Sequence, residues 1–262
     1  MEDNRKTVLA VGTHPDDIEF MMSGTFMLLG SMGCDLHYMN VANGSCGTSE
    51  YSSEDIIRIR REEGINAAQY AGAIFHGSLV DDLEVYYESK TLRRLSAVIR
   101  EIAPDIILTH GPNEYMEDHS NTCRLVVTAA FSRGMMNYPV DPPTQVVDND
   151  LCLYHAMPYG LTDGMRKPFI PEMFVDVGSV LDRKSEMLAK HKSQKEWLDV
   201  SQGHDSYIHT MQEITGQMGE LSGHFEYAEG WIRHSHMGFC GPEDDPVRDV
   251  LGSDIVKRNS SR

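Results

Sequence analysis

The sequence lacks several features that would place it in other classes of protein. No apolar stretch approaches the roughly 20 residues that a membrane-spanning helix needs. The five cysteines are widely spaced, odd in number and form no CxxC pair, so they predict neither a disulfide framework nor a thiolate zinc site. The opening MEDNRKTVLAVG does not have the pattern of a signal peptide. These absences predict a soluble protein of the reducing cytoplasm.

Positive charge is also scarce. The chain has 23 Lys and Arg residues against 40 Asp and Glu, a formal net charge of -17. Such a field opposes binding to phosphate backbones and to anionic lipid. Glycine-rich phosphate loops are missing too, since residues 43–48 lack the GxxxxGK[ST] spacing and no GxGxxG follows the first apolar run. We therefore expect no nucleic acid, no membrane and no nucleotide cofactor.

What is present indicates one globular domain of the α/β class. With 262 residues, 40% of them apolar, the chain can bury a sizeable core as a single domain over residues 1–262. Strand candidates alternate with helix candidates, which predicts a Rossmann-like three-layer fold with a mostly parallel sheet. The strands are expected at residues 7–12, 35–41, 73–76, 106–109 and 151–155, and the helices at 24–30, 53–71 (capped by Ser53), 92–99 and 118–135.

The C-terminal portion is less regular. Residues 137–175 are richer in Pro, Gly and Asp, which favours a loop-rich elaboration that shapes a substrate cleft. Helices are expected at 180–200 and 207–221. The polar composition of residues 238–262 favours a flexible tail that frays.

Two polar segments follow predicted strands. His14-Pro15-Asp16-Asp17 comes after the first strand, and the segment ending in Asp118-His119 comes after the strand at 106–109. In open α/β sheets, ligands bind beyond the carboxyl ends of the strands, so both segments should face one rim. Catalytic zinc usually has three protein N/O ligands and a fourth position for water. We predict His14, Asp17 and His119 as ligands.

Asp16 and Asp118 complete the predicted site. A carboxylate beside an activated water can act as general base, and Asp16 is the candidate. Asp118 is expected to orient an imidazole from outside the ligand set. The alternative is that Asp16-Asp17 is only a helix N-cap, which such residues commonly form. The joint occurrence of both segments after separate strands favours the metal.

These segments belong to a wider resemblance. The chain is similar to the PIG-L/LmbE-like family of zinc deacetylases up to about residue 232. The matching segments, in order, are Ala10–Glu19 (AVGTHPDDIE), Ser23-Gly24-Thr25, Arg60-Arg61-Glu62-Glu63, Leu108–Pro112 leading to Asp118-His119, Lys190–Gln194 (KHKSQ) and Tyr227–Gly230. The resemblance implies a Rossmann-like enzyme that removes N-acetyl groups from glucosamine-type sugars.

The same resemblance implies roles for individual residues. His14, Asp17 and His119 would hold one Zn²⁺ per chain, with another divalent metal as an alternative, and Asp16 would be the base. Arg60 matches an arginine near the substrate pocket, although it could equally be a solvated helix charge or pair with Glu63. His191 also matches, but a histidine between two lysines can be a favourable helix C-terminal charge, so it stays outside the predicted catalytic core.

One departure from the family concerns the proton for the leaving amine. Many members have His-Pro-Asp-His where this chain has Met116-Glu117-Asp118-His119, and Met116 cannot donate a proton. Either Glu117, His110, His155 or another histidine takes over this duty, or Asp16 itself returns the proton, or the chain belongs to a branch of the family with altered chemistry or substrate. Glu117 and His110, with Arg60, are the predicted substrate-binding residues.

The predicted function is hydrolysis of an N-acetyl group on an amino sugar or glucosamine conjugate, by zinc-activated water with Asp16 as base. The alternatives are a zinc amidase acting on a thiol-sugar conjugate or another acylated small molecule, a catalytically silent metal- or sugar-binding module, and, more distantly, a nucleotide-binding protein. The expected partner is a small N-acylated sugar. Similar proteins often form oligomers, so a homo-oligomer stays open. Further histidines, among them His204, His209, His224, His234 and His236, are expected at the surface, and Cys46 is expected to be a small buried or loop thiol.

Overall fold

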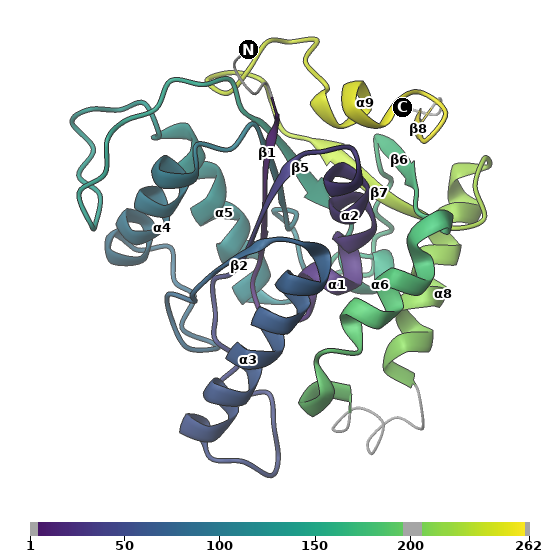
Figure 1. Ribbon diagram of the computed structural model, residues 1–262, viewed down its shortest axis with the longest axis horizontal. Coiled ribbons are helices and arrows are strands. Elements are labelled where there is room, and N and C mark those ends of the chain that lie inside the picture. The colour runs from purple at the N-terminus through teal and green to yellow at the C-terminus, as the bar shows by residue number, and fades with distance from the viewer. Residues whose placement is uncertain (1–4, 196–205, 260–262) are drawn as a thin grey trace.

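A computed structural model describes residues 5–195 and 206–259 of the chain. His204 and the end of the helix predicted at 180–200 lie outside these residues. The described part is a three-layer α/β unit, with helices on both faces of one eight-stranded sheet (Figure 1). The predicted Rossmann-like fold is confirmed. In the described residues we find no helix that combines the length and apolar character needed to cross a membrane.

The first half of the chain builds the parallel part of the sheet. Five strands pair in parallel in the order β3-β2-β1-β4-β5. They are β1 (Thr7–Gly12), β2 (Asp35–Asn40), β3 (Ile74–His76), β4 (Ile106–Thr109) and β5 (Cys152–Ala156), connected by α1 (Asp17–Met21), α2 (Ser23–Ser31), α3 (Ser53–Ala71), α4 (Ser89–Ile102) and α5 (Glu117–Phe131). Each predicted strand is present to within two residues at either end.

Strand β1 shows why this sheet needs cover on both faces. Val8 and Ala10 belong to the apolar cluster that includes residues of α1, α2, α6 and α8, whereas Leu9 and Val11 belong to the cluster beneath α4 and α5. All four side chains are fully buried. Because successive strand residues point to opposite faces, a strand that is apolar at every position must lie between two layers of helices. Figure 1 shows α4 and α5 on one side of β1 and α2 on the other, and Ala67 and Ala68 of α3 belong to the same apolar cluster as α2.

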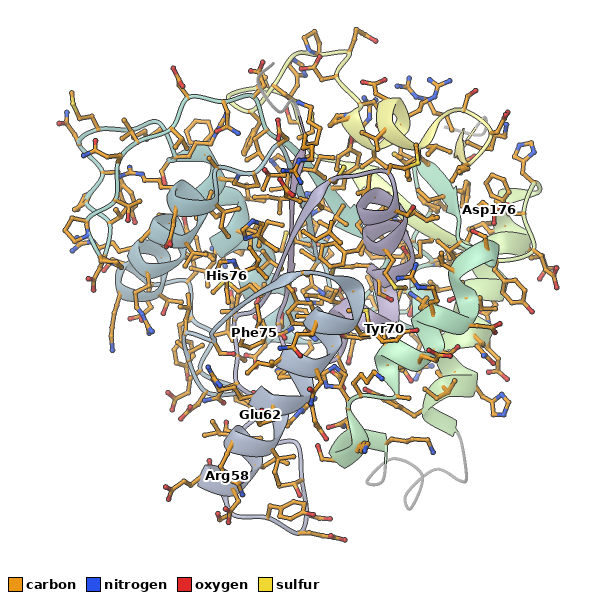
Figure 2. All side chains as sticks on the ribbon, viewed as in Figure 1. Arg58, Glu62, Tyr70, Phe75, His76 and Asp176 are labelled. Carbon is orange, nitrogen blue, oxygen red and sulfur yellow. The ribbon has the colours of Figure 1, made fainter. Side chains whose placement is uncertain are left out.

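Helix α3 spans the predicted residues, but its cap differs by one position. Ser52, not Ser53, is the N-cap, and its Oγ accepts a hydrogen bond from the Asp55 N–H at 3.2 Å. The helix ends at Gly72, whose φ of 76° is the left-handed conformation that glycine adopts most easily. Arg58 and Glu62 lie on the outer surface of α3 (Figure 2).

The second half of the chain extends the sheet with antiparallel strands. The order continues from β5 through β7 and β6 to β8, and all three of these pairings are antiparallel. The elements are η1 (Tyr159–Leu161), β6 (Met173–Asp176), η2 (Gly178–Val180), α6 (Leu181–Leu188), α8 (Ser206–Ser222), β7 (Ala228–Arg233), α9 (Pro246–Leu251) and β8 (Val256–Arg258). None of these strands was predicted, and the helix expected from residue 180 ends at Leu188.

The prediction of a flexible C-terminal tail is wrong for residues 238–259. This segment forms α9 and β8, and β8 pairs with β6 at the edge of the sheet. Val247, Leu251 and Val256 are buried in the main apolar cluster. Their burial stabilises the segment, because three well-placed apolar side chains are enough to anchor an otherwise polar stretch.

A buried ion pair ties the second half of the chain to the first. Glu229 of β7 accepts hydrogen bonds from the backbone N–H groups of Gly24 and Thr25, both at 2.8 Å, at the start of α2. The Lys184 ammonium lies 2.5 Å from Glu229 Oε1 and also donates to the Phe20 carbonyl at 2.8 Å. Both charged side chains are almost completely buried. This pair therefore positions α6 and β7 against the helices that follow His14–Asp17.

Candidate metal centre

The turn after β1 holds the Asp17 carboxylate in place. The backbone N–H groups of Thr13 and His14 both donate to Asp17 Oδ2, at 3.0 and 2.7 Å. The Asn40 side-chain amide at the end of β2 donates to the His14 carbonyl at 2.7 Å. A short Asp side chain that accepts local backbone N–H groups stabilises such a turn. The carboxylate is therefore fixed before any ligand binds.

Asp16 has an unusual backbone conformation in the same turn. Its φ is 121° and its ψ is -21°. A positive φ is rare for a residue other than glycine and costs on the order of 1–3 kcal/mol. Strained residues of this kind cluster at functional sites, where the surrounding contacts hold them. This conformation allows Asp16 to line the same cavity as His14 and Asp17.

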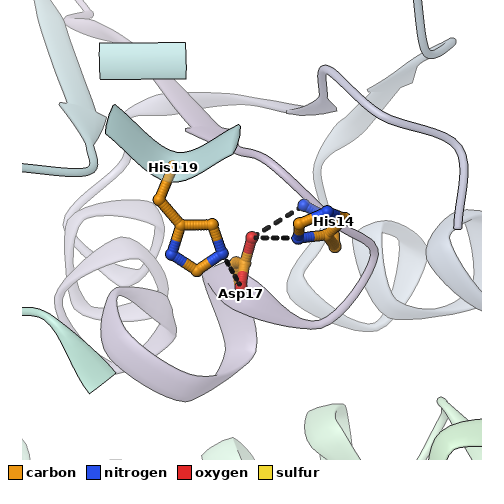
Figure 3. A group of neighbouring side chains, drawn as sticks. All are labelled: His14, Asp17 and His119. Atoms are coloured by element: carbon orange, nitrogen blue, oxygen red, sulfur yellow. Dashed lines mark hydrogen bonds and ion pairs between the residues drawn. The ribbon is translucent and has the colours of Figure 1, made fainter. Parts of the chain in front are cut away.

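Three predicted ligands converge at this turn (Figure 3). His119, in the first turn of α5, has its Nε2 3.4 Å from Asp17 Oδ1, and His14 Nδ1 is 3.6 Å from Asp17 Oδ2. Both nitrogens of His119 are buried and have no hydrogen-bond partner. Buried polar atoms normally have partners, and an unprotonated ring nitrogen can bind a metal through its lone pair, so these unpartnered nitrogens fit a bound cation. The two imidazoles and one carboxylate suit zinc.

Asp118 lies beside His14, the imidazole that it can orient. Its Oδ2 is 3.2 Å from His14 Nε2 and accepts the backbone N–H of Leu83 at 2.8 Å. Burial opposes ionisation of Asp118, but these hydrogen bonds hold its pKa below the usual value. An ionised Asp118 directs His14 Nδ1 toward Asp17.

The cluster is short of positive charge. Burial disfavours protonated imidazoles, yet the Asp118 and Asp17 carboxylates raise the pKa of His14 to about 10. Asp17 and Glu114 likewise raise the pKa of His110 to about 9 despite its burial. For Asp17, burial is outweighed by His119 and His110, so its pKa lies well below the usual value. A divalent cation would supply the positive charge that protons supply otherwise.

Glu114 is a member of the cluster that sequence reasoning missed. Its side chain is only 1% exposed, with Oε1 3.5 Å from His110 Nδ1 and Oε2 3.6 Å from His119 Nδ1. The two imidazoles stack with ring centroids 4.2 Å apart. His110 Nε2 lies 3.0 Å from the Thr13 nitrogen and 3.3 Å from Asp17 Oδ2, and its Nδ1 faces Glu114. The available signal was an acidic residue in the loop that leads from His110 to His119.

The predicted base, Asp16, is held by two other side chains. The Tyr207 hydroxyl of α8 donates to Asp16 Oδ2 at 2.7 Å, and Arg60 Nη2 lies 3.2 Å from the same oxygen. Arg60 also donates to the Pro15 carbonyl. Burial raises the pKa of Asp16, and the Arg60 charge opposes this effect. Tyr207 was not predicted, because nothing in the helix pattern of α8 marks it.

Arg60 therefore anchors the loop of the base, although it also lines the cavity. It is 3% exposed and pairs with Asp16, whereas the expected alternative was an ion pair with Glu63. Glu63 instead accepts hydrogen bonds from the Ser193 N–H and hydroxyl, at 2.8 and 2.7 Å. His191 Nε2 lies 3.2 Å from Glu19 Oε1, below the cavity. The Glu63–Ser193 contacts therefore join α3 to the KHKSQ segment.

The candidates for the missing histidine do not all reach the site. Met116 lines the cavity together with His110. Glu117 is exposed at the start of α5 and is not among the described residues that line the cavity. His155 is buried elsewhere, with Nδ1 2.7 Å from the His110 carbonyl and Nε2 2.9 Å from His234 Nδ1. Glu117 and His155 are therefore displaced from the cavity, and the predicted substrate role of Glu117 has no structural basis.

The three candidate ligands, His14, Asp17 and His119, line a cavity of about 380 Å³. This volume suits a small-molecule ligand. One wall is aromatic: the Tyr115 and Tyr159 rings lie 5.9 Å apart, and Phe20 contacts both Tyr159 and Tyr207. Tyr159 comes from the 137–175 range that was expected to shape a cleft. Tyr115 and Tyr159 are 49% and 40% exposed, so their faces are accessible to a ligand.

Comparison with known proteins identifies a family match over the first half of the chain. Residues 9–130 match the family model described as PIG-L, GlcNAc-PI de-N-acetylase. The chain carries a PIG-L family domain. That segment includes the last four residues of β1, the whole of β4, and both of the turns that supply His14, Asp17 and His119. The resemblance read from the sequence is confirmed.

Relatives of the PIG-L domain differ in their reactions. A diacetylchitobiose deacetylase of Thermococcus kodakarensis is 29% identical over 231 residues, 86% of this chain and 82% of the relative. A 4-oxalmesaconate hydratase of Pseudomonas putida is 25% identical over 192 residues, 70% of this chain and 72% of the relative. The structure of an N,N'-diacetylchitobiose deacetylase from Pyrococcus horikoshii superposes with a TM-score of 0.75 at 22% identity, covering 89% of this chain and 85% of that one. The structural likeness establishes the fold.

Proposed function

We propose that this protein is a metal-dependent deacetylase that hydrolyses the N-acetyl group of an amino sugar or glucosamine conjugate. The observation that carries the proposal is the convergence of His14, Asp17 and His119, with the Asp16 carboxylate beside them in one cavity. The deacetylase relative at 29% identity supports the same reaction. One Zn²⁺ per chain would bind to these three side chains through His14 Nδ1, His119 Nε2 and a carboxylate oxygen of Asp17.

Zinc, when bound, supplies a Lewis acid that makes water more acidic and stabilises negative charge on a carbonyl oxygen. The chain supplies the base. Among the described residues, only Oδ2 of Asp16 has hydrogen-bond partners, Tyr207 and Arg60, which leaves Oδ1 to take a proton from the attacking water. Burial raises the pKa of Asp16 and so makes it a stronger base than an exposed carboxylate.

The leaving amine needs a proton, and Asp16 is the group best placed to return it. The water oxygen bonds to the acetyl carbon, the amide C–N bond breaks, and the proton held by Asp16 passes to the departing nitrogen. Met116 lies in the cavity but has no proton to give. Both nitrogens of His110 lie against protein groups, Nε2 beside Thr13 and Asp17 and Nδ1 beside Glu114. One carboxylate therefore serves as base and then as acid.

The charge of the cavity argues against the reaction for which the hydratase relative is named. The hydratase relative acts, by its name, on a carboxylated substrate. Among the described lining residues, Arg60 is the one Lys or Arg, and it is paired with Asp16. The same lining includes Asp16, Asp17, Asp82 and Glu114. A neutral sugar that leaves as an amine suits this acidic cavity better than a polyanion does.

An acetate-release assay tests the proposal. Metal-free protein, prepared with a chelator, is supplied with Zn²⁺ and a panel of N-acetylated mono- and disaccharides. We expect acetate to form with zinc and to stop with the chelator. Acylated thiol-sugar conjugates in the same panel distinguish an amidase of broader substrate choice. Zinc and sugar binding without acetate release would instead identify a catalytically silent binding module and would overturn the proposal.

A further inference from the structure

A second group of potential metal ligands lies at the opposite end of β5. Cys152, the first residue of β5, has its Sγ 3.0 Å from that of Cys240, although the two residues are 88 positions apart. A carboxylate oxygen of Asp244 lies within 4.8 Å of both sulfur atoms. The three side chains line a cavity of about 150 Å³, which His234 and His236 also line. The wide spacing of the cysteines in the sequence hides this pairing.

The surrounding contacts fix the turn that contributes two of these side chains. The Cys240 N–H donates to the His236 carbonyl at 3.1 Å, and the Gly241 N–H donates to Asp244 Oδ2 at 2.7 Å. Arg233 Nη1 donates to the Asp244 backbone carbonyl at 3.2 Å. These contacts hold Cys240 and Asp244 in one turn, and the Leu151 N–H donates to the Phe239 carbonyl at 2.9 Å, which ties this turn to the start of β5.

The charges near the cysteines favour a cation. Arg233 is paired with Glu172 at 2.8 Å, and Arg258 is paired with Asp245 at 3.3 Å. Among the described residues, no Lys, Arg or His lies within ion-pair distance of the Asp244 carboxylate. The Asp244 carboxylate therefore lies beside the two sulfur atoms without a cationic side chain to neutralise it.

We propose that Cys152, Cys240 and Asp244 form a second divalent-cation site, selective for a soft metal such as zinc. Binding releases the two thiol protons as two metal–sulfur bonds form, and the Asp244 carboxylate supplies the third ligand. Water in the cavity completes the four positions that zinc prefers. With metal–sulfur bonds of about 2.3 Å, two sulfur ligands of tetrahedral zinc are about 3.8 Å apart, so the sulfur atoms need to separate by less than about 1 Å. The site would fasten the C-terminal segment to the parallel part of the sheet.

Cobalt(II) gives a test that separates this site from the first. Tag-free full-length protein is reduced with a phosphine, freed of metal with a chelator and titrated with Co²⁺ alone. Thiolate ligands give a near-ultraviolet charge-transfer band, which the imidazoles and carboxylate of the first site do not. We expect the band in the wild type and in His14→Ala, and total zinc binding of about two ions per chain in the wild type.

Substitutions in the second site should abolish the band without unfolding the chain. Cys240→Ser is expected to lose it and to bind about one zinc ion per chain, and Asp244→Asn is expected to weaken binding at least about tenfold. Cys34→Ser, at a half-buried cysteine outside the cluster, is the matched control and should keep the band. Absence of the band in reduced wild type, its persistence in folded Cys240→Ser, or recovery of the pair only as a disulfide would overturn the proposal. The result does not depend on acetate release.

Discussion

The parallel and antiparallel halves of this molecule contribute to the site in different ways. The turns after β1 and β4, both in the parallel half, carry the three proposed ligands. The half that follows β5 contributes Tyr207, which holds the proposed base, and Tyr159, which lines the cavity. It also contributes Glu229, which caps α2. The parallel half therefore carries the proposed metal ligands and base. The antiparallel half positions the base, shapes the cavity and stabilises the fold.

The largest effect should come from the proposed base in the parallel half. Asp16→Asn removes the proton acceptor but keeps the shape of the side chain, so we expect kcat for acetate release to fall about 10²- to 10⁴-fold with the bound metal unchanged. Metal analysis and steady-state kinetics on the same preparation measure both quantities. Glu62→Gln, at an exposed position of α3, is the control and should keep full activity. Full turnover by zinc-loaded Asp16→Asn would show that the base is elsewhere.

In the antiparallel half the largest effect should be on stability. Glu229→Ala leaves the Lys184 ammonium buried without its partner, and we expect the free energy of unfolding to fall by about 3–5 kcal/mol. Urea denaturation monitored by circular dichroism measures the loss.

Two comparisons sharpen this measurement. Asp35→Ala removes an exposed ion pair with Arg5 and should cost less than about 1 kcal/mol. The double variant Lys184→Met with Glu229→Gln should be more stable than Glu229→Ala, because it leaves no uncompensated charge. Equal stability of Glu229→Ala and the wild type would contradict the view that the antiparallel half secures the fold through this pair.

Glu114 tests whether the parallel half also orients its own ligands. Glu114→Gln should weaken metal binding about 10- to 100-fold, since the carboxylate faces Nδ1 of His119 and His110. Competition with a chromogenic chelator measures the affinity. Glu117→Gln, three residues later but exposed, is the matched control and should bind metal and turn over normally. Identical affinities for the two variants would remove Glu114 from the site.

The smallest effect should come from the hydroxyl that the antiparallel half contributes. Tyr207→Phe removes one hydrogen bond to Asp16, which should lower kcat about tenfold with little change in KM or metal content. Tyr227→Phe, at a partly buried tyrosine near the same helix, serves as the control. A larger loss than that of Asp16→Asn would reverse the comparison and move the essential group into the antiparallel half.

Much of the parallel half could be predicted because its patterns are local. Strand β1 is apolar at successive positions and is followed directly by His14–Asp17, so both the strand and the position of its polar turn can be read from adjacent residues. Helix α3 has regular apolar periodicity and residues of high helix propensity, which is why its span is predicted correctly and its N-cap to within one position. The antiparallel strands are three to six residues long, and their adjacent residues form no comparably clear pattern. Their pairing depends on partners far along the chain.

The sequence by itself determined the α/β class, the succession of strands and helices along the first half of the chain, and the residue types that suit zinc. These follow from short-range periodicity and from the chemistry of His and Asp side chains. Only the tertiary structure decided which distant groups meet. In the candidate metal centre, Tyr207 and Arg60 contact Asp16, and Glu114 faces the two imidazoles of His110 and His119. In the second proposed site, Cys152 lies beside Cys240. No local pattern encodes such contacts, because they arise when packing of the two apolar clusters brings separate segments of the chain together.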